Sequence, residues 1–276
     1  LAFGGFLTGG FVPAARSLGL PVVLHEANQT PGRAVRQCAR WATHVWHPPG
    51  SGPAAWRMAR QAAPVGFPLR AEMQPMPRAT ARVQLDLPVD GPLLLVAGGS
   101  QGATVLNAWA ETHREALAAA GIHCLCLGGL ASEPIEIRAA NGTLFRRIPF
   151  CRQMPAALSA ATLAVARAGA GSIAEFVRCR LPSILVPYPF AADDHQAANA
   201  AALTRCGGAE WLRQSNLDAL LPRVLATLGD PAFLAERQQN LAAMDEPDAA
   251  MRVAEHLVGL VNGVSPSSVV RNHDAA

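Results

Sequence analysis

The sequence has 276 residues, enough for two domains of ordinary size and a substantial hydrophobic core. Half of its residues are hydrophobic and 16% are charged, a balance typical of globular chains and not of disordered ones. A formal net charge of +3, few aromatic residues and no arginine-rich run among them argue against nucleic acid as a partner.

No apolar run reaches the ~18–20 residues that a membrane helix needs, and the best candidate, ALSAATLAVA, ends at Arg167. The first residues lack the basic start of a secretory signal and begin inside a glycine-rich turn, so we expect the true N-terminus to lie upstream. The six cysteines form no CxxC pair, which favours a reducing cytosol. Cys124 and Cys126 share one face of an expected strand, where we expect them to pack rather than to bind metal.

The beginning of the chain alternates short apolar runs with helical stretches, which favours an α/β fold with a mainly parallel sheet. Proline-rich residues with little periodicity follow, and we interpret them as a linker into a second domain. The elements expected before that linker are strands at 21–26 and 43–47, a helix at 32–42, and a strand end running into a glycine- and proline-rich stretch at 63–70.

The later part of the chain repeats the same alternation, which predicts a second parallel sheet. We divide the chain into a first domain at 1–66, a second domain at 67–246, a final helix at 247–262 and a disordered tail at 263–276. The elements expected in the second domain are strands at 91–97, 122–127, 143–148, 162–167 and 183–188, and helices at 103–120, 194–206, 216–229 and 231–244.

A glycine-rich turn, GGSQG, lies between the expected strand at 91–97 and the helix after it. Ligands of doubly wound sheets bind at the carboxyl ends of strands, and glycines let the backbone approach them closely. The turn is neither GxGxxG nor a P-loop. Ser100 and Gln101 are therefore candidate phosphate contacts, although an ordinary turn has the same composition.

The stretch RAGAGSIAEF begins another helix after a strand, with Ala170, Gly171 and Ser172 at its start. Unpaired N–H groups and a partial positive charge make a bare helix N-terminus suitable for phosphate, and Glu175 could then accept hydrogen bonds from hydroxyls of the same ligand. The alternative is a capping box, with Ser172 as the cap and Glu175 three residues on.

Two further strand ends carry polar side chains. In PYPFAADDHQAANA, the side chains of His195, Gln196 and Asn199 could bond sugar hydroxyls, while the alternative is a polar helix start capped by Asp193 or Asp194.

In VVLHEANQTPGR, the candidate functional residues are His25, Glu26 and Asn28. Glu26 could act as a general base with His25 as its orienting neighbour, or the strand could simply end in ordinary polar residues.

No cofactor and no metal are expected. The sequence contains no DxD triplet, and its remaining histidines show no metal-ligand spacing. A diphosphate bound here would be neutralised by backbone amides, helix N-termini and Arg70.

In order along the chain, these motifs resemble the undecaprenyldiphospho-muramoylpentapeptide β-N-acetylglucosaminyltransferases of bacterial peptidoglycan synthesis. The resemblance extends from residue 1 to about 262. The segments that carry it are LGLPVVLHEAN at 18–28, VGFPLR at 65–70, VAGGSQGATVLN at 96–107, RAGAGSIAEF at 167–176 and VPYPFAADDHQAANA at 186–200.

The resemblance implies a GT-B fold, in which two Rossmann-like doubly wound domains face each other across a cleft, here with the first domain incomplete. It implies a donor, UDP-N-acetylglucosamine, a lipid-linked muramoyl-pentapeptide acceptor, and peripheral attachment at the cytoplasmic face of the bacterial membrane. The roles that it implies are ribose binding by Glu175, uracil binding by the backbone of Cys151, diphosphate binding by Ser100, Arg70 and 170–172, sugar recognition by His195 and Gln196, and sugar or acceptor contact by Asn28.

The chain departs from the family pattern in three places. It has no GGTGGH loop, HEAN stands where HEQN is usual, and His195 stands where some relatives have glutamine. We therefore expect a chain that lacks the N-terminal part of the family's first domain. The alternative functions are another GT-B UDP-sugar transferase, a UDP-N-acetylglucosamine 2-epimerase, or an inactive nucleotide-sugar-binding module.

Overall fold

The computed structural model describes residues 1–5, 7–52, 56–99 and 101–262, so the predicted tail at 263–276 lies outside the described residues. The chain forms two compact units, described separately below. Unit 1 comprises Leu1–Arg70 together with Glu246–Ala276, and unit 2 comprises Ala71–Asp245.

Unit 1 is built on a three-stranded parallel sheet in the order β1-β2-β3. Its last helix is contributed by residues that follow unit 2 in the sequence. The elements of unit 1 are α1 (Thr8–Ser17), β1 (Val23–His25), α2 (Arg33–Cys38), the 3-10 turn η1 (Ala39–Trp41), β2 (His44–His47), β3 (Ala62–Pro64) and α11 (Ala249–Val261).

Alternation along β1 and β2 explains why this small sheet has a core on both faces, because successive strand residues point to opposite sides. Leu24 and Val45 pack with Val35 of α2 and Val12 of α1. Their neighbours Val23 and Trp46 pack on the other face with Val253 of α11. The return of the chain to unit 1 therefore covers a face that would otherwise expose apolar side chains.

Unit 2 is built on a seven-stranded sheet in the order β10-β9-β8-β4-β5-β7-β6, in which β6 alone is antiparallel to its neighbour. Its strands are β4 (Leu93–Ala97), β5 (His123–Leu127), β6 (Ile135–Arg138), β7 (Leu144–Ile148), β8 (Leu163–Ala166), β9 (Ser183–Leu185) and β10 (Ala209–Trp211). Its helices are α3 (Arg78–Gln84), α4 (Thr104–Thr112), α5 (Arg114–Ala119), α6 (Met154–Ala160), α7 (Ala170–Arg178), α8 (His195–Arg205), α9 (Leu220–Leu228) and α10 (Pro231–Met244), with 3-10 turns η3 (Ala192–Asp194) and η4 (Gln214–Ala219).

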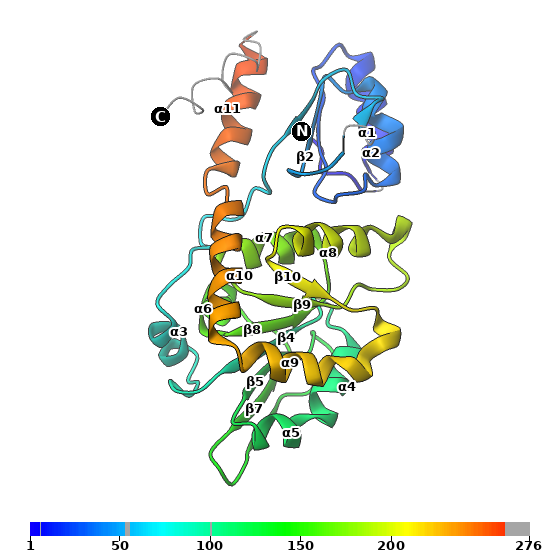
Figure 1. Ribbon diagram of the computed structural model, residues 1–276. Helices are drawn as coiled ribbons and strands as arrows, with labels where there is room; N and C mark the ends of the chain where they lie inside the picture. Colours follow the sequence, from blue (N-terminus) through cyan, green and yellow to red (C-terminus); the bar gives the residue numbers. More distant parts are fainter. Residues whose placement is uncertain (6, 53–55, 100, 263–276) are drawn as a thin grey trace. The chain divides into compact units, whose positions relative to one another are not determined.

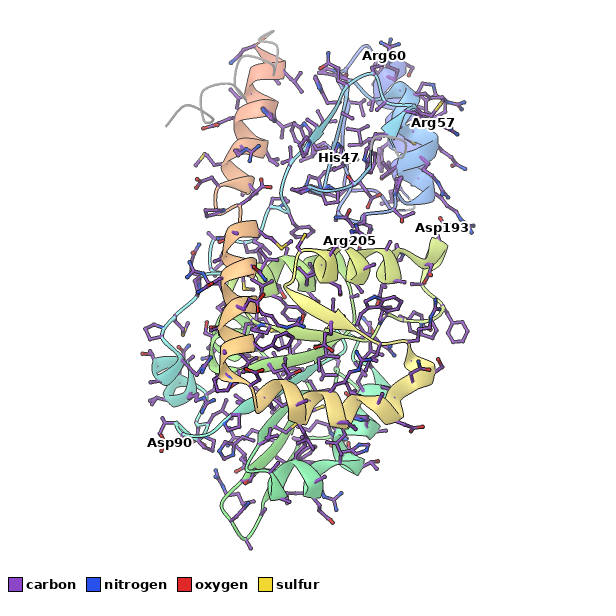
Figure 2. The ribbon with its side chains drawn as sticks, in the orientation of Figure 1. His47, Arg57, Arg60, Asp90, Asp193 and Arg205 are labelled. Atoms are coloured by element: carbon purple, nitrogen blue, oxygen red, sulfur yellow. The ribbon has the colours of Figure 1, made fainter. Side chains whose placement is uncertain are left out.

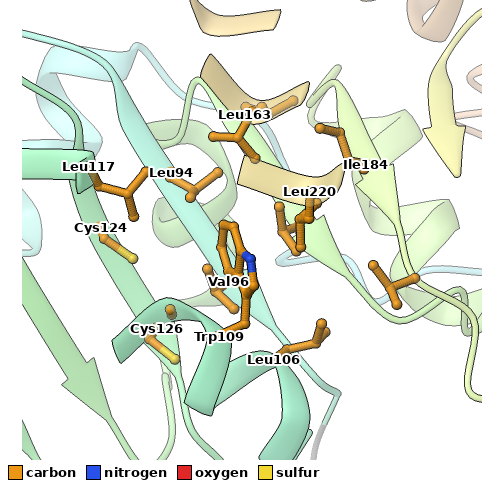
Figure 3. Packing of buried hydrophobic residues seen from close by; sticks show 14 of the residues in the cluster. Leu94, Val96, Leu106, Trp109, Leu117, Cys124, Cys126, Leu163, Ile184 and Leu220 are labelled. Atoms are coloured by element: carbon orange, nitrogen blue, oxygen red, sulfur yellow. The ribbon is translucent and has the colours of Figure 1, made fainter. Parts of the chain in front are cut away.

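Helices cover both faces of this sheet (Figure 1). On one face Trp109 of α4 packs against Leu94, Val96 and Leu220, the last of these from α9 (Figure 3). Cys124 and Cys126 belong to this same buried cluster, which confirms the prediction that they pack. Burial raises the pKa of the Cys126 thiol to about 12, so it is an inert thiol at neutral pH.

The sequence predictions of elements were incomplete in both units, and α1 of unit 1 was not predicted. The single helix expected at 103–120 is interrupted at His113, and the stretch interpreted as a linker contains α3. Strands β6 and β10 were not predicted. In α3, Arg82 is only 1% exposed because its guanidinium donates to the backbone carbonyl oxygens of Ala160 and of 88–91, contacts that no sequence pattern reveals.

Among the described residues, no helix is both long and apolar enough to cross a membrane.

Buried histidines make the stability of the fold sensitive to acid. Burial lowers the pKa of His25, His44, His47, His123 and His256. Below pH ~6.5 these histidines bind protons more readily in the unfolded chain than in the folded chain, so acid favours unfolding.

We expect the urea concentration at the midpoint of unfolding to decrease when the pH is lowered from 7.5 to 5.5. His256→Asn should reduce this pH dependence more than His113→Asn, and equal slopes in the two variants would contradict the assignment.

Candidate functional site

The strand order of unit 2 places a topological switch point between β4 and β8. From β4 the chain moves outward to β5 and the edge strand β6, comes back as β7, and then continues on the other side of β4 as β8 and β9. In an open α/β sheet, ligands bind outside the carboxyl ends of the strands at this point. The turn after β4 and the helix start after β8, both selected from the sequence as candidates, flank it.

The turn between β4 and α4 is packed tightly against the loop that follows β5. A Cβ atom added to Gly102 would overlap the carbonyl of Gly128, and one added to Gly98 would overlap the backbone of Ala103. The same Gly128 carbonyl accepts a hydrogen bond from Nδ2 of Asn107, at 2.8 Å. Glycine is thus required at positions 98 and 102, because neighbouring backbone atoms leave no room for a Cβ atom. Gln101 is exposed, and Ser100 lies outside the described residues.

Helix α7 starts without a side-chain cap. Its N-cap is Gly169, whose φ of −68° and ψ of 140° are extended, and Ser172 lies in the first helical turn. The capping-box alternative is therefore wrong. The N–H groups of 170–172 have no acceptor within the helix, as required for anion binding at such a position. Glu175 lies one turn further on and is half-buried.

Gln196 joins the loop that follows β8 to the loop that follows β9 through two hydrogen bonds. Its Oε1 atom accepts hydrogen bonds from the N–H of Ala168, at 3.2 Å, and from the N–H of Tyr188, at 2.9 Å. One helical turn later, Asn199 is 4% exposed and donates from Nδ2 to the carbonyl of Ala168, at 3.2 Å. Both contacts of Gln196 use its oxygen, so the Nε2 amide is the end that can donate to a sugar.

The turn before α8 has a strained backbone. Asp193 and Asp194 both have positive φ, at 52° and 53°. Asp194 occupies the N-cap position but its side chain makes no capping hydrogen bond. The Nδ1 atom of the following His195 lies 2.6 Å from the carbonyl oxygen of Ala192. This bond fixes the orientation of the imidazole at the start of the helix.

Arg167 also joins the loop after β8 to the loop after β9, and it was not among the candidate residues chosen from the sequence. It is 8% exposed, and its Nη1 donates to the carbonyl oxygens of Val186 and Pro187 while Nη2 donates to Oε1 of Gln214. Burial lowers the pKa of Arg167. These acceptors are neutral, so the guanidinium brings positive charge to the carboxyl ends of β8 and β9.

We expect Gln196→Ala to weaken binding of UDP-N-acetylglucosamine more than binding of UDP. The substitution leaves two backbone N–H groups without their acceptor, at a cost of about 1–3 kcal/mol, and releases the loop predicted to face the sugar. Calorimetric titration of both ligands measures the difference. Gln196→Glu keeps an acceptor oxygen for the two N–H groups but lacks the Nε2 donor, so it should preserve the loop contacts and still lose the bond to the sugar. Equal losses for UDP and UDP-N-acetylglucosamine would contradict a role of this residue in the sugar half of the site.

In unit 1, Glu26 is buried and its carboxylate is fully engaged with its own loop. Oε1 accepts from the backbone N–H and from Nδ2 of Asn28, both at 2.9 Å. Oε2 accepts from the N–H of Gly32 at 2.8 Å. Removing a proton from an acceptor hydroxyl would require one of these donors to be exchanged for it. The geometry thus favours Glu26 as a residue that positions Asn28.

His25 lies under this loop and is 1% exposed. Its Nε2 atom is 3.3 Å from the carbonyl oxygen of Gly66, and its Nδ1 atom has no hydrogen-bond partner among the described residues. Burial lowers its pKa, with the Gly66 bond and the Glu26 charge acting in the opposite direction. A neutral His25 ring that donates from Nε2 to the carbonyl oxygen of Gly66 satisfies both the lowered pKa and this hydrogen bond.

The two remaining predicted residues, Arg70 and Cys151, differ in exposure. Arg70 is exposed at the end of the first segment of unit 1. Cys151 is 7% exposed and follows β7, directly after the exposed Phe150. Across the described residues, no group of three or more histidine, cysteine or carboxylate side chains is arranged to hold a metal ion.

Residues 93–253, which include the switch point, match the Glycosyltransferase family 28 C-terminal domain. The chain is 44% identical over 241 residues to the UDP-N-acetylglucosamine–N-acetylmuramyl-(pentapeptide) pyrophosphoryl-undecaprenol N-acetylglucosamine transferase of Opitutus terrae, an alignment that covers 84% of this chain and 62% of the relative. The transferase of the same name from Synechococcus sp. (strain JA-2-3B'a(2-13)) is 39% identical over 264 residues, 93% of this chain and 70% of the relative.

The crystal structure of Acinetobacter baumannii MurG has 30% sequence identity and a TM-score of 0.70, and the match covers 95% of this chain and 73% of that chain. The chain belongs to this family of N-acetylglucosamine transferases. The family resemblance and the α/β fold of GT-B type are thus confirmed. The chain spans 62% and 70% of the two relatives' own lengths.

Proposed function

We propose that this chain transfers N-acetylglucosamine from UDP-N-acetylglucosamine to the muramoyl 4-hydroxyl of an undecaprenyl-diphosphate-linked muramoyl-pentapeptide, in peptidoglycan synthesis. Its relatives carry this donor and this acceptor in their names. The observation that carries the proposal is the adjacency of β4 and β8, which brings a close-packed glycine turn and an uncapped helix start to the same edge of one sheet.

The donor would bind to unit 2. Backbone N–H groups of 170–172 and the turn after β4 would hold the diphosphate, and the carboxylate of Glu175 would accept bonds from the ribose hydroxyls. The backbone at Cys151 would contact the uracil. His195 and Gln196 begin α8 beside the same strand ends, where their ring and amide could bond sugar hydroxyls.

The transfer would proceed with inversion. The oxygen of the acceptor hydroxyl attacks the anomeric carbon, the bond from that carbon to the diphosphate breaks, and UDP leaves with the electron pair. Donors already oriented in unit 2 stabilise the charge that develops on UDP. The hydroxyl proton passes to a base. Glu26, with His25 beside it, is the base that the sequence predicts, but it could take the proton only by exchanging one of its three hydrogen bonds for the acceptor hydroxyl. Asn28 would contact the sugar or the acceptor.

Because the acceptor is lipid-linked, we propose that unit 1 contacts the cytoplasmic face of the cell membrane without crossing it. Leu7 at the start of α1, Phe11 within it and Leu18 at its end are 67%, 67% and 74% exposed. Arg16 lies on the same helix. Exposed apolar side chains beside a cation are suited to the interface of an anionic bilayer.

Replacement of Glu175 by alanine tests the donor site. A hydroxyl bound by a charged acceptor contributes about 1.5–3 kcal/mol, so we expect Glu175→Ala to weaken UDP-N-acetylglucosamine binding by about ten- to a hundredfold. Glu115→Ala removes a carboxylate whose side chain is 86% exposed and should have no effect. Calorimetric titration measures both variants, and unchanged affinity in Glu175→Ala would contradict ribose binding.

Titration of the unchanged chain tests the donor identity. We expect UDP-N-acetylglucosamine to bind more tightly than UDP-N-acetylgalactosamine, which differs from it only at the sugar 4-position. Failure of the folded chain to bind either nucleotide sugar would overturn the proposed donor site.

A further inference from the structure

We propose that a cavity in unit 1 binds the carboxylate-bearing end of the acceptor's pentapeptide. This proposal rests on the function proposed above, because that function supplies the peptide. The cavity has a volume of about 350 Å³, within the range of small-molecule sites. Its walls include Gln29 and Thr30 from the loop after β1, Val35 and Arg36 from α2, and Trp56 and Arg57 from the segment before β3.

The charge of this part of the chain favours an anionic ligand. Residues 1–70 contain seven arginines and a single carboxylate, Glu26, whose two oxygens accept bonds from the N–H groups of 28 and 32. Two of those arginines, Arg36 and Arg57, line the cavity, and both side chains are exposed. A planar guanidinium is the group that matches a carboxylate with two parallel hydrogen bonds.

The apolar part of the cavity is held in place before any ligand binds. The indole of Trp56 stacks on His47, with ring centroids 4.8 Å apart and an interplanar angle of 7°. Its Nε1 also donates to Oγ of Ser51, at 3.1 Å. Elsewhere in the lining, Nε2 of Gln29 donates to the carbonyl of Pro49, at 3.1 Å. A fixed apolar surface in a cavity that two arginines also line suits a short peptide with an apolar side chain next to its terminal carboxylate.

The position of the cavity connects it to the acceptor. Gln29 and Thr30 directly follow Asn28, the residue predicted to contact the sugar or acceptor, and the same loop is fixed by Glu26. An acceptor whose sugar lies at Asn28 can therefore extend its peptide along Gln29 and Thr30. The exposed apolar side chains suited to a bilayer belong instead to α1, which contributes nothing to the lining. These observations favour a peptide over a lipid headgroup.

The proposal can be tested by NMR of the indole N–H groups. The chain has five tryptophans, and Trp56→Phe identifies the signal of Trp56. We expect a soluble muramoyl-pentapeptide without lipid to shift this signal. Arg57→Ala should weaken that binding about fivefold, the size of effect that one exposed ion pair provides. Arg60→Ala is the charge-matched control, because Arg60 lies three residues on and does not line the cavity (Figure 2).

A peptide amidated at its C-terminus should bind equally weakly to the unchanged chain and to Arg57→Ala. The proposal is overturned if the pentapeptide leaves the Trp56 signal unmoved in a folded chain, or if Arg57→Ala and Arg60→Ala bind alike. It is also overturned if vesicles of anionic phospholipid move the signal and the peptide does not. UDP-N-acetylglucosamine binding in the same sample separates this failure from that of the proposed function, since the donor site belongs to unit 2.

Discussion

Parallel pairing of β4 with β8 is the constraint on which the donor site depends. A parallel pair brings two carboxyl ends to the same edge, and the crossover that leads to β8 reverses the direction in which strands are added. The glycine turn and the N-terminus of α7 are neighbours for this reason, although about seventy residues separate them in the sequence. Without that pairing, the glycine turn and the helix N-terminus would lie apart and could not bind one ligand together.

Polar side chains then fix the loops that the sheet brings together. Arg167 and Gln196 each bond atoms of the loop after β9, and Gln196 and Asn199 each bond Ala168. Buried polar networks of this kind raise the precision of a site, because each group would lose its partner if a loop moved. In unit 1, Glu26 serves its loop in the same way through three hydrogen bonds.

The two units differ in charge as well as in size. The segment 1–70 is strongly basic, whereas unit 2 has acidic and basic residues in nearly equal number. A diphosphate-linked acceptor that carries a peptide carboxylate has negative charge at both groups, which fits the basic segment 1–70. Unit 2 instead offers backbone N–H groups and the buried guanidinium of Arg167 at these strand ends, which suit a nucleotide diphosphate that must leave after transfer.

The sequence by itself determined the fold class and the main strands and helices, because apolar runs and glycine turns reflect local geometry. Its motifs also identified the family. Tertiary structure alone decided the contacts between distant segments. Arg167 belongs to no recognisable motif, and charged residues interrupt the short strands β6 and β10, so neither shows an apolar run. Arg82 is buried because five backbone carbonyl groups accept its hydrogen bonds. Glu26 looked like a base in sequence, and the fold turned its oxygens toward its own loop.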